Sequence, residues 1–360
     1  MAIKVNGQTV VDENRNHTVS SNTELANDAY ILIANNDSVS SDGYSVGGTK
    51  AIAEDGFSFN RFDASNLTLS FATIPAAQGS VSGYTSGGSP SFANTIDKFP
   101  FAADGNATDV GDLSQGRVGP VGQSSDVSGY ASGGSSPTGI VNTIDKFPFA
   151  ADGNATDVGD LTQNRERMAG QSSDVSGYAS GGRRPSLVNT IDKFPFAADT
   201  NATDVGDLTQ ARQAPAGQSS TESGYTSGGY APPYVNTIDK FPFAADGNAT
   251  DVGDLTQSRG YMPGQSSAES GYTSGGNAPP FVTTIDKFPF STDANATDVG
   301  DLTQARWWAA GQSSTESGYT SGGNPGPLNT IDKFPFSTDG NATDVGDLTQ
   351  ARIDSAGQQV

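Results

Sequence analysis

Hydrophobic and polar positions alternate over short stretches of this chain. In residues 238–243, Ile, Lys and Pro alternate with Asp, Phe and Phe. A period of two is typical of a β-strand, in which successive side chains point to opposite faces. We therefore expect the phenylalanines to line one face and pack between neighbouring sheets, while the lysine points outward.

The same stretch belongs to a tandem repeat of about 47 residues. Each full unit carries a tyrosine in the motif SGY(T/A)SGG, followed by TIDKFPF. These tyrosines are Tyr84, Tyr130, Tyr178, Tyr225, Tyr272 and Tyr319. One unit contains four strand-length segments, GQSS, SGYTSGG, NTIDKFPF and DVGDLTQ, separated by Gly, Asn, Asp or Pro. Four antiparallel strands per unit predict an all-β chain folded as a β-propeller, with one blade per repeat.

The units resemble the kelch-type propeller repeat. That family has a Gly-Gly pair closing its second strand, an apolar and aromatic third strand, a fourth strand and then an arginine. The matching residues of one unit are Gly228 and Gly229, the stretch 238–243, Leu255 and Arg259. The tryptophan usual in the family's fourth strand is absent. The resemblance covers roughly residues 42–360 and implies kelch-like blades.

The two ends of the repeat array predict how the ring closes. Ala356, Gly357 and Gln358 match the start of a first strand, so residues 353–360 form a strand without a blade of their own. Residues 42–72 resemble a degenerate blade lacking that strand, with Tyr44, Gly47 and Gly48 in its second strand. Joining them predicts seven blades within a propeller of residues 41–360, whose six full repeats span 77–352. The alternative is six blades, with residues 1–75 as a separate domain.

Residues 1–40 are predicted to form an N-terminal arm. Asn6-Gly7 suits a two-residue turn between the alternating stretches AIKV and QTVV, which predicts a β-hairpin, and residues 30–33 form one further apolar strand. The opening segment resembles the N-terminus of virion structural proteins of tailed phages, particularly marine and cyanobacterial ones. The residues that fit are Ile3, Val5, Asn6, Gly7, Val10, Val11, Asp12, Arg15 and Asn16. The resemblance implies an anchor that attaches many copies of the chain to other virion proteins. The alternative is an ordinary pair of capping strands.

Two stretches differ in every unit while the frame hardly changes. One lies between SGG and NTID, and the other between the arginine and GQSS. In a four-stranded meander both emerge on the same face of the disc, so one-sided diversity predicts a binding face for an asymmetric partner. Its candidate residues are of types that anchor interfaces and stack on sugars: Trp307, Trp308, Tyr230, Tyr234, Tyr261, Phe281, Arg183 and Arg184. An extended loop would expose at least one of the two tryptophans. Alternatively, these residues only stiffen the loops.

Charge and residue usage narrow the function. Asp and Glu number 40 against 19 Lys and Arg, which gives a formal net charge of −21. Such a surface repels phosphate backbones and anionic lipids, so we expect no nucleic-acid partner, and no apolar run suggests a membrane span or signal peptide. The chain has no Cys and its one histidine, His17, lies in the arm, which argues against Cys nucleophiles, Ser-His-Asp triads and His-rich metal sites in the propeller.

The repeated segment DGNATDVGD partly resembles a calcium loop, but its sixth position is Asp where such loops need Gly. A capped hairpin turn explains the same residues, so we predict no metal and no cofactor. The leading hypothesis is a non-enzymatic virion protein of a tailed phage, serving in the tail, a fibre or capsid decoration, which displays a binding face to a partner or to a host surface protein or glycan. The alternatives are a secreted or surface propeller lectin and a glycoside-processing enzyme.

Overall fold

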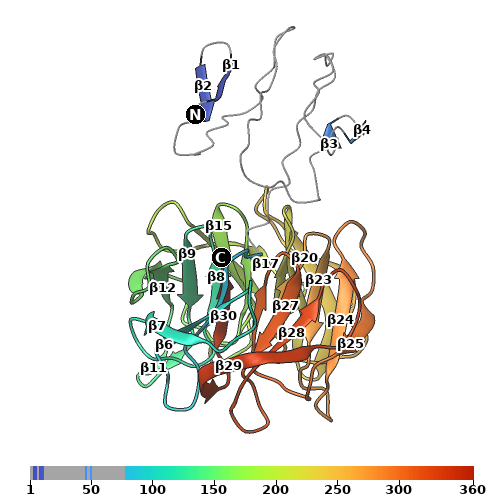
Figure 1. Ribbon diagram of the computed structural model, residues 1–360. Helices are drawn as coiled ribbons and strands as arrows, with labels where there is room; N and C mark the ends of the chain where they lie inside the picture. Colours follow the sequence, from blue (N-terminus) through green and yellow to red (C-terminus); the bar gives the residue numbers. More distant parts are fainter. Residues whose placement is uncertain (1–2, 6–7, 12–44, 47–48, 51–77) are drawn as a thin grey trace. The chain divides into compact units, whose positions relative to one another are not determined.

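The computed structural model describes residues 3–5, 8–11, 45–46, 49–50 and 78–360 (Figure 1). The chain divides into two compact units, Met1–Thr73 and Ile74–Val360. In the first unit, β1 (Ile3–Val5) pairs antiparallel with β2 (Gln8–Val11), which confirms the predicted hairpin strands. A second small pair joins β3 (Ser45–Val46) to β4 (Thr49–Lys50). The predicted turn at Asn6-Gly7 and the predicted strands over 30–33 and beyond residue 50 lie outside the described residues.

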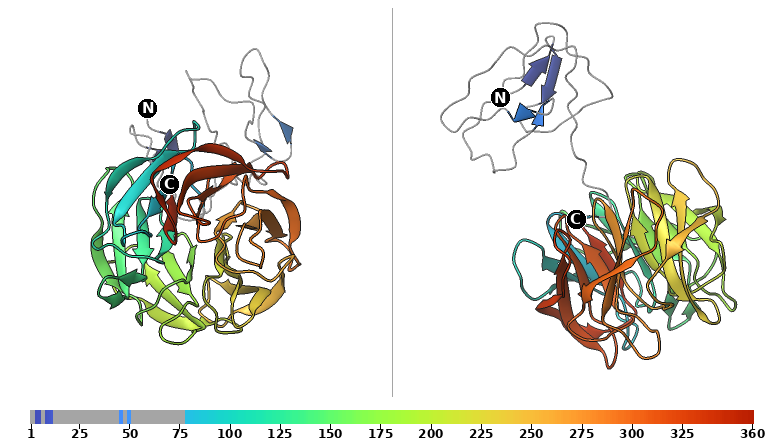
Figure 2. Two further views of the ribbon diagram at one scale, coloured as in Figure 1. Left: turned by 90° about the horizontal axis from the view of Figure 1, so that it is seen from below. Right: turned by 90° about the vertical axis from the view of Figure 1, so that its right-hand side faces the viewer.

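Residues 78–360 form a β-propeller of six four-stranded antiparallel sheets, which confirms the all-β prediction (Figure 2). From the inner strand outward, blade 1 contains β30 (Ala356–Gln359), β5 (Ser82–Ser86), β6 (Thr95–Pro100) and β7 (Thr108–Asp112). Blade 2 contains β8 (Val121–Ser124), β9 (Ser128–Ser132), β12 (Thr143–Pro148) and β13 (Thr156–Asp160). Blade 3 contains β14 (Ala169–Ser172), β15 (Ser176–Ser180), β16 (Thr190–Pro195) and β17 (Thr203–Asp207). Blade 4 contains β18 (Ala216–Ser219), β19 (Ser223–Tyr230), β20 (Tyr234–Pro242) and β21 (Thr250–Asp254). Blade 5 contains β22 (Gly264–Ser266), β23 (Ser270–Ser274), β24 (Thr284–Pro289) and β25 (Thr297–Asp301). Blade 6 contains β26 (Ala310–Ser313), β27 (Ser317–Ser321), β28 (Leu328–Pro335) and β29 (Thr343–Arg352). A short pair, β10 (Ser135–Ser136) and β11 (Gly139–Ile140), extends one loop of blade 2. No helix among the described residues is long and apolar enough to cross a membrane.

The ring is closed by the C-terminal strand, as predicted, but its partner differs from the prediction. β30 pairs with β5, so residues 356–359 complete the blade of Tyr84 and not a blade built from residues 42–72. The prediction of seven blades is therefore wrong, and the six-blade alternative holds. The unit that begins at residue 77 has no first strand of its own: residues 78–81 lead into β5 without forming one.

The inner strands explain why this ring has no place for a seventh blade. Each carries a glycine packed against the glycine of the previous blade, and the series closes on itself. A Cβ on Gly357 would lie 2.0 Å from the carbonyl oxygen of Gly311, and one on Gly122 would lie 2.0 Å from that of Gly357. Both distances are far below van der Waals contact, so the six strands already meet side by side around the axis.

Aromatic side chains fill the spaces between blades, which confirms the predicted packing of the phenylalanines. Tyr178 of β15, for example, stacks on Phe243 of the next blade at a centroid distance of 4.8 Å and contacts Phe241 at 5.5 Å. Lys193 extends over the same tyrosine and pairs with Asp246 of the next blade. Because this arrangement recurs around the ring, a hydrophobic core lies between each pair of neighbouring blades, and each blade contributes side chains to the core on either side of it.

A buried ion pair also joins every pair of neighbouring blades. The arginine that follows each fourth strand reaches the aspartate of the next blade's third strand, and both side chains are fully buried. Arg212 and Asp239, for example, are 2.9 Å apart, and Thr209 donates two further hydrogen bonds to that carboxylate. The other pairs are Arg117–Asp145, Arg165–Asp192, Arg259–Asp286, Arg306–Asp332 and Arg352–Asp97.

Candidate functional site

The two variable stretches of each unit lie together on one face of the propeller, which we call the variable face. Single β-bridges join them in every blade, as between Gln213 and Tyr230 or between Trp307 and Asn324. β11 marks this face at the lower edge of the ring in Figure 1, and the left view of Figure 2 is taken from that side. We call the opposite face the constant face. Sequence differences between the units are therefore concentrated on one side of the disc.

At the centre of the variable face, six equivalent residues form what we call the axial ring. Each is the second residue of the linker that leads into an inner strand, and each has a positive φ between 52° and 66°. The members are Gly119, Arg167, Ala214, Tyr261, Trp308 and Asp354. Their backbones form a closed cycle of hydrogen bonds, in which each N–H donates to the preceding member's carbonyl at 2.7–3.0 Å.

The backbone conformation shared by the axial ring does not explain which side chains its members carry. Glycine adopts a positive φ without strain, as at Gly119, whereas other residues there cost roughly 1–2 kcal/mol each. Five of the six positions nevertheless carry a side chain, and no two members are the same residue. Strained backbone kept for particular side chains is characteristic of functional sites.

Four of these side chains converge over the axis. Arg167 pairs with Asp354 at 3.3 Å, and its guanidinium lies 5.2 Å from the ring centre of Trp308 and 5.8 Å from that of Tyr261. Gly119 lies between the two charged residues, where a Cβ would crowd the Arg167 side chain at 3.3 Å. Burial raises the pKa of the Asp354 carboxyl above its usual value, and the nearby Arg167 opposes that shift.

An aromatic cluster extends outward from the axial ring over blades 4–6. Phe281 stacks on Trp307 at a centroid distance of 5.3 Å, and Tyr261 lies 5.5 Å from each tryptophan. Tyr234 lies 6.3 Å from Tyr261 and 5.1 Å from Tyr230. The structure thus brings together all six aromatic residues that the sequence singled out.

The two tryptophans differ from the sequence-based expectation that one of them is exposed. Both are half-buried, and their ring centres are 3.9 Å apart. The positive φ of Trp308 turns the chain, so that the adjacent side chains meet instead of pointing in opposite directions. Phe281 is the more exposed member of the cluster, at 41%.

Several polar atoms on this face have no hydrogen-bond partner among the described residues. Apart from atoms of the arginines and tyrosines that recur from blade to blade, every buried side-chain atom without a partner in the described part of the chain lies on this face. They are Gln213 Oε1, Asn277 Oδ1, Trp307 Nε1, Trp308 Nε1 and Ser355 Oγ. A buried polar atom without a partner costs about 1–3 kcal/mol. A ligand that offers both donors and acceptors would recover that free energy.

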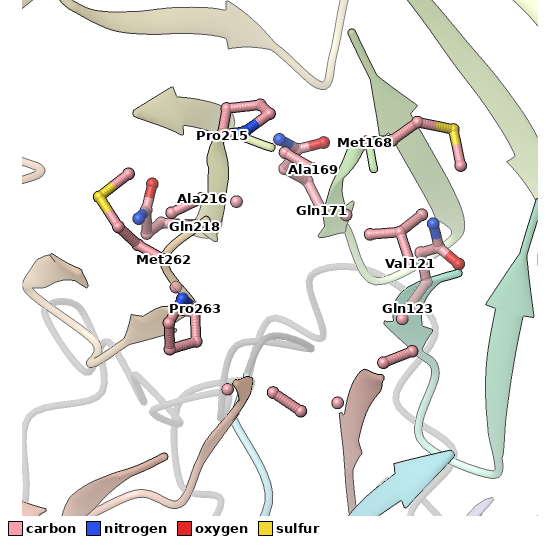
Figure 3. Close-up of a pocket in the computed structure, with 18 of the residues that line it drawn as sticks. Val121, Gln123, Met168, Ala169, Gln171, Pro215, Ala216, Gln218, Met262 and Pro263 are labelled. Carbon is pink, nitrogen blue, oxygen red and sulfur yellow. The ribbon is translucent and has the colours of Figure 1, made fainter. Parts of the chain in front are cut away.

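The axial ring surrounds the mouth of a cavity on the propeller axis, of about 150 Å³. Figure 3 shows its wall, in which Val121, Ala169, Ala216 and Pro263 lie on consecutive blades around an open centre. The glutamines of the inner strands are engaged elsewhere, as when Gln171 donates to the Tyr225 carbonyl of the next blade. The charged and aromatic residues that line this cavity all belong to the axial ring.

The predicted residues Arg183 and Arg184 lie on the same face but on blade 3. Arg183 pairs with Glu166 of the preceding linker at 2.6 Å, and Arg184 donates to Gln163 Oε1 at 2.7 Å. The sequence analysis missed Arg167 and Asp354, which lie closer to the aromatic residues. Gly119 was the available signal, because a glycine among unrelated residues at one repeated position indicates a positive φ.

The constant face carries the repeated DGNATD loops. Asp104 pairs with Lys333, Asn106 accepts from the backbone N–H of Asp347, and Asp109 accepts from that of Gly111. These side chains thus cap backbone groups and bridge blades, which fits the turn interpretation. Among the described residues, no group of three or more acidic, His or Cys side chains is arranged to hold a metal ion.

The constant face also holds the point at which the chain enters the propeller. Residues 78–81 run along it, and the N–H groups of Val81 and Ser82 donate to the Val360 carbonyl. The described part of this unit therefore begins on the side opposite the aromatic cluster. No protein-family model matches this chain, and no curated protein is significantly similar to it.

Proposed function

We propose that this protein is a non-enzymatic recognition module, which binds its partner through the variable face around the axial ring. The observation that carries the proposal is the set of five non-glycine side chains held at positive φ on one equivalent position of the ring. Folding alone would favour glycine at all six positions. The adjoining aromatic cluster supplies the residue types that dominate binding free energies.

The carboxylates of the variable face support binding over catalysis. Asp354 is paired with Arg167 and Glu166 with Arg183, so each of these two carboxylates already has a cationic partner. The repeated glutamates, such as Glu222, lie in turns of the constant face and recur in several blades. A catalytic pair that flanks a scissile bond would have to be unique to one place in the ring.

The recognition proposal predicts that the two tryptophans can be removed without unfolding the protein. Blade 4 carries Gln213 and Ala214 at the equivalent positions, so Trp307→Gln with Trp308→Ala reproduces a linker that this backbone already accepts. We expect the free energy of unfolding to change by no more than about 1–2 kcal/mol, and binding to weaken more than about tenfold. The measurement is binding of the full chain to immobilised glycans and cell-surface extracts, compared with its urea denaturation.

Glu222→Ala, an exposed change on the constant face, is the control and should bind as the wild type does. Recognition through the aromatic cluster is ruled out if the tryptophan variant binds normally. It is equally ruled out if that variant unfolds, because the tryptophans would then be structural.

We further propose that the module belongs to the virion of a tailed phage, with residues 1–40 as its anchor to other virion proteins. The support is the resemblance of the segment that contains Ile3, Val5, Val10 and Val11, together with entry of the chain on the constant face. In this proposal the variable face meets a partner or a host surface. A secreted or surface lectin is the alternative, since it would use the same face without a particle.

A chain that begins at Ile74 tests the anchor. The closed ring of residues 78–360 contains all six blades, so we expect this shortened chain to remain a folded monomer and to keep its binding. It should no longer be incorporated into virions, which quantitative mass spectrometry of purified particles would measure against the full chain. Equal incorporation of the two chains would contradict the anchor.

A further inference from the structure

The mouth of the axial cavity combines an ion pair with aromatic faces, and this combination restricts the ligands that it can take. Arg167, Asp354, Tyr261 and Trp308 come from linkers to four different blades and meet at one point on the axis. The other two members of the axial ring are Ala214 and Gly119, and the Arg167 and Asp354 side chains pack against Gly119. The site is therefore single and has no counterpart elsewhere in the ring.

Cationic ligands fit this site poorly because the protein supplies its own cation. The Arg167 guanidinium already lies over Trp308 at 5.2 Å and over Tyr261 at 5.8 Å, and it already neutralises Asp354. A lysine or arginine of a partner would have to displace it from both the carboxylate and the rings. The favourable cation–π interaction is thus already satisfied within the chain.

Anionic ligands are disfavoured by the surrounding charge. Arg167 is paired with Asp354, so it offers no net positive charge to an incoming carboxylate, sulfate or phosphate. The whole chain has a formal net charge of −21, and this field repels anions as they approach. The electrostatics therefore select a neutral ligand.

The remaining groups match a neutral ligand with many hydroxyls. Trp308 Nε1 is a donor and Ser355 Oγ can be a donor or an acceptor; both residues line the cavity, and neither atom has a partner among the described residues. Aromatic faces beside such groups suit a sugar ring, whose C–H faces are apolar and whose edge carries hydroxyls. Hydrogen bonds from the ligand would offset the desolvation of these atoms.

The cavity also limits how much of a ligand can enter. Its volume of about 150 Å³ is below that of ordinary small-molecule sites, which begin near 300 Å³. The cavity therefore takes no more than one sugar ring. The rest of a longer chain would lie outside, across Trp307 and Phe281.

We propose that the mouth of the axial cavity binds a single neutral saccharide residue, packed against Tyr261 and Trp308 and hydrogen-bonded by Trp308 Nε1 and Ser355 Oγ. This inference rests on the proposed function, because it names the ligand class of the same recognition face. It assigns to Arg167 and Asp354 the role of a neutralised pair that excludes charged ligands.

The test uses the fluorescence of tryptophan, since the only two tryptophans of the chain are Trp307 and Trp308. The full chain is titrated with the methyl glycosides of neutral hexoses and 6-deoxyhexoses, of neutral N-acetylhexosamines, and of a uronic acid as the charged counterpart. We expect at least one neutral glycoside to give a saturable change in emission, and the uronic acid to bind at least about tenfold more weakly.

Trp308→Gly is the decisive variant, because blade 2 carries Gly119 at this position and glycine suits the positive φ. Trp307 remains as the reporter. We expect affinity for the glycoside to fall more than about tenfold while urea denaturation is unchanged. Undiminished glycoside binding by this variant, or tighter binding of the uronic acid, would overturn the proposal.

The two proposals fail in distinguishable ways. If no neutral glycoside changes the emission, while the Trp307→Gln/Trp308→Ala variant still loses binding to a cell-surface protein, the face recognises protein. The saccharide inference is then wrong and the recognition module stands. If that variant keeps its binding to every surface, both are wrong.

Discussion

Removal of residues 356–360 is expected to lower the free energy of unfolding by several kcal/mol and to convert the protein into an aggregation-prone form. They include β30 (Ala356–Gln359), the inner strand of blade 1. Without them, β5 loses its partner strand and becomes an exposed sheet edge, although all five of its residues are buried in the closed ring. The hydrogen bond from Gln358 to the Tyr130 carbonyl of the next blade is lost as well.

Urea denaturation and light scattering would measure both effects. A synthetic peptide of residues 356–360, added to the shortened chain, supplies the control because it can refill the vacant place beside β5. We expect the peptide to restore most of the lost stability in a concentration-dependent way. A shortened chain that is as stable as the full one would show that the ring does not depend on β30.

The architecture was predictable from sequence because each repeat carries its own strand pattern and turn residues. The alternation in TIDKFPF and the spacing of the tyrosines are local signals, and the C-terminal AGQ matched a first strand. Which blade that strand completes depends on long-range geometry. Residues 78–81 differ little in composition from a first strand, so only the close contact of Gly357 with Gly311 and Gly122 reveals that the ring closes at six blades.

Loss of the Asp239 carboxylate is expected to cost about 3–5 kcal/mol of stability, because the change Asp239→Asn leaves a buried charge without its counterion. Arg212 has no exposed surface and lies 2.9 Å from that carboxylate. The same oxygens accept two hydrogen bonds from Thr209, so the amide would also disturb the start of the linker that follows β17. Urea denaturation of the variant and the wild type would give the difference directly.

The neighbouring residue provides a matched control. Lys240 pairs with Asp293 of the next blade at 3.0 Å, but these side chains are 29% and 57% exposed. An exposed pair contributes about 0–1 kcal/mol, so Asp293→Asn should have almost no effect. Equal losses for Asp239→Asn and Asp293→Asn would contradict the structural role assigned to the buried pairs.

The candidate site was only partly predictable from sequence, because its assembly also depends on long-range geometry. Trp307, Trp308, Tyr261 and Phe281 stand out in sequence because their sister units carry unrelated residues there. Their gathering into one cluster depends on the linkers and loops of three adjacent blades lying side by side. Arg167 and Asp354 lie 187 positions apart in the chain and meet only because the ring closes.

The framework contacts and the variable face depend on different positions of each repeat. Residues that bridge blades, such as Arg212, Asp239 and Tyr225, recur in each unit because each must form the same contact. The axial ring has the same backbone in every blade but six different residues. A change there alters the centre of the variable face while the contacts between blades remain.

The most direct test of this account is to block each face separately. The chain has no cysteine, so Ser186→Cys on the variable face and Ala268→Cys on the constant face each give one exposed attachment point for a polyethylene glycol chain. Binding of the two conjugates to a cell surface recognised by the wild type is then compared. We expect the polymer at residue 186 to abolish binding and the polymer at residue 268 to leave it unchanged. Loss of binding only with the polymer at residue 268 would show that the constant face recognises the partner, and would contradict the account.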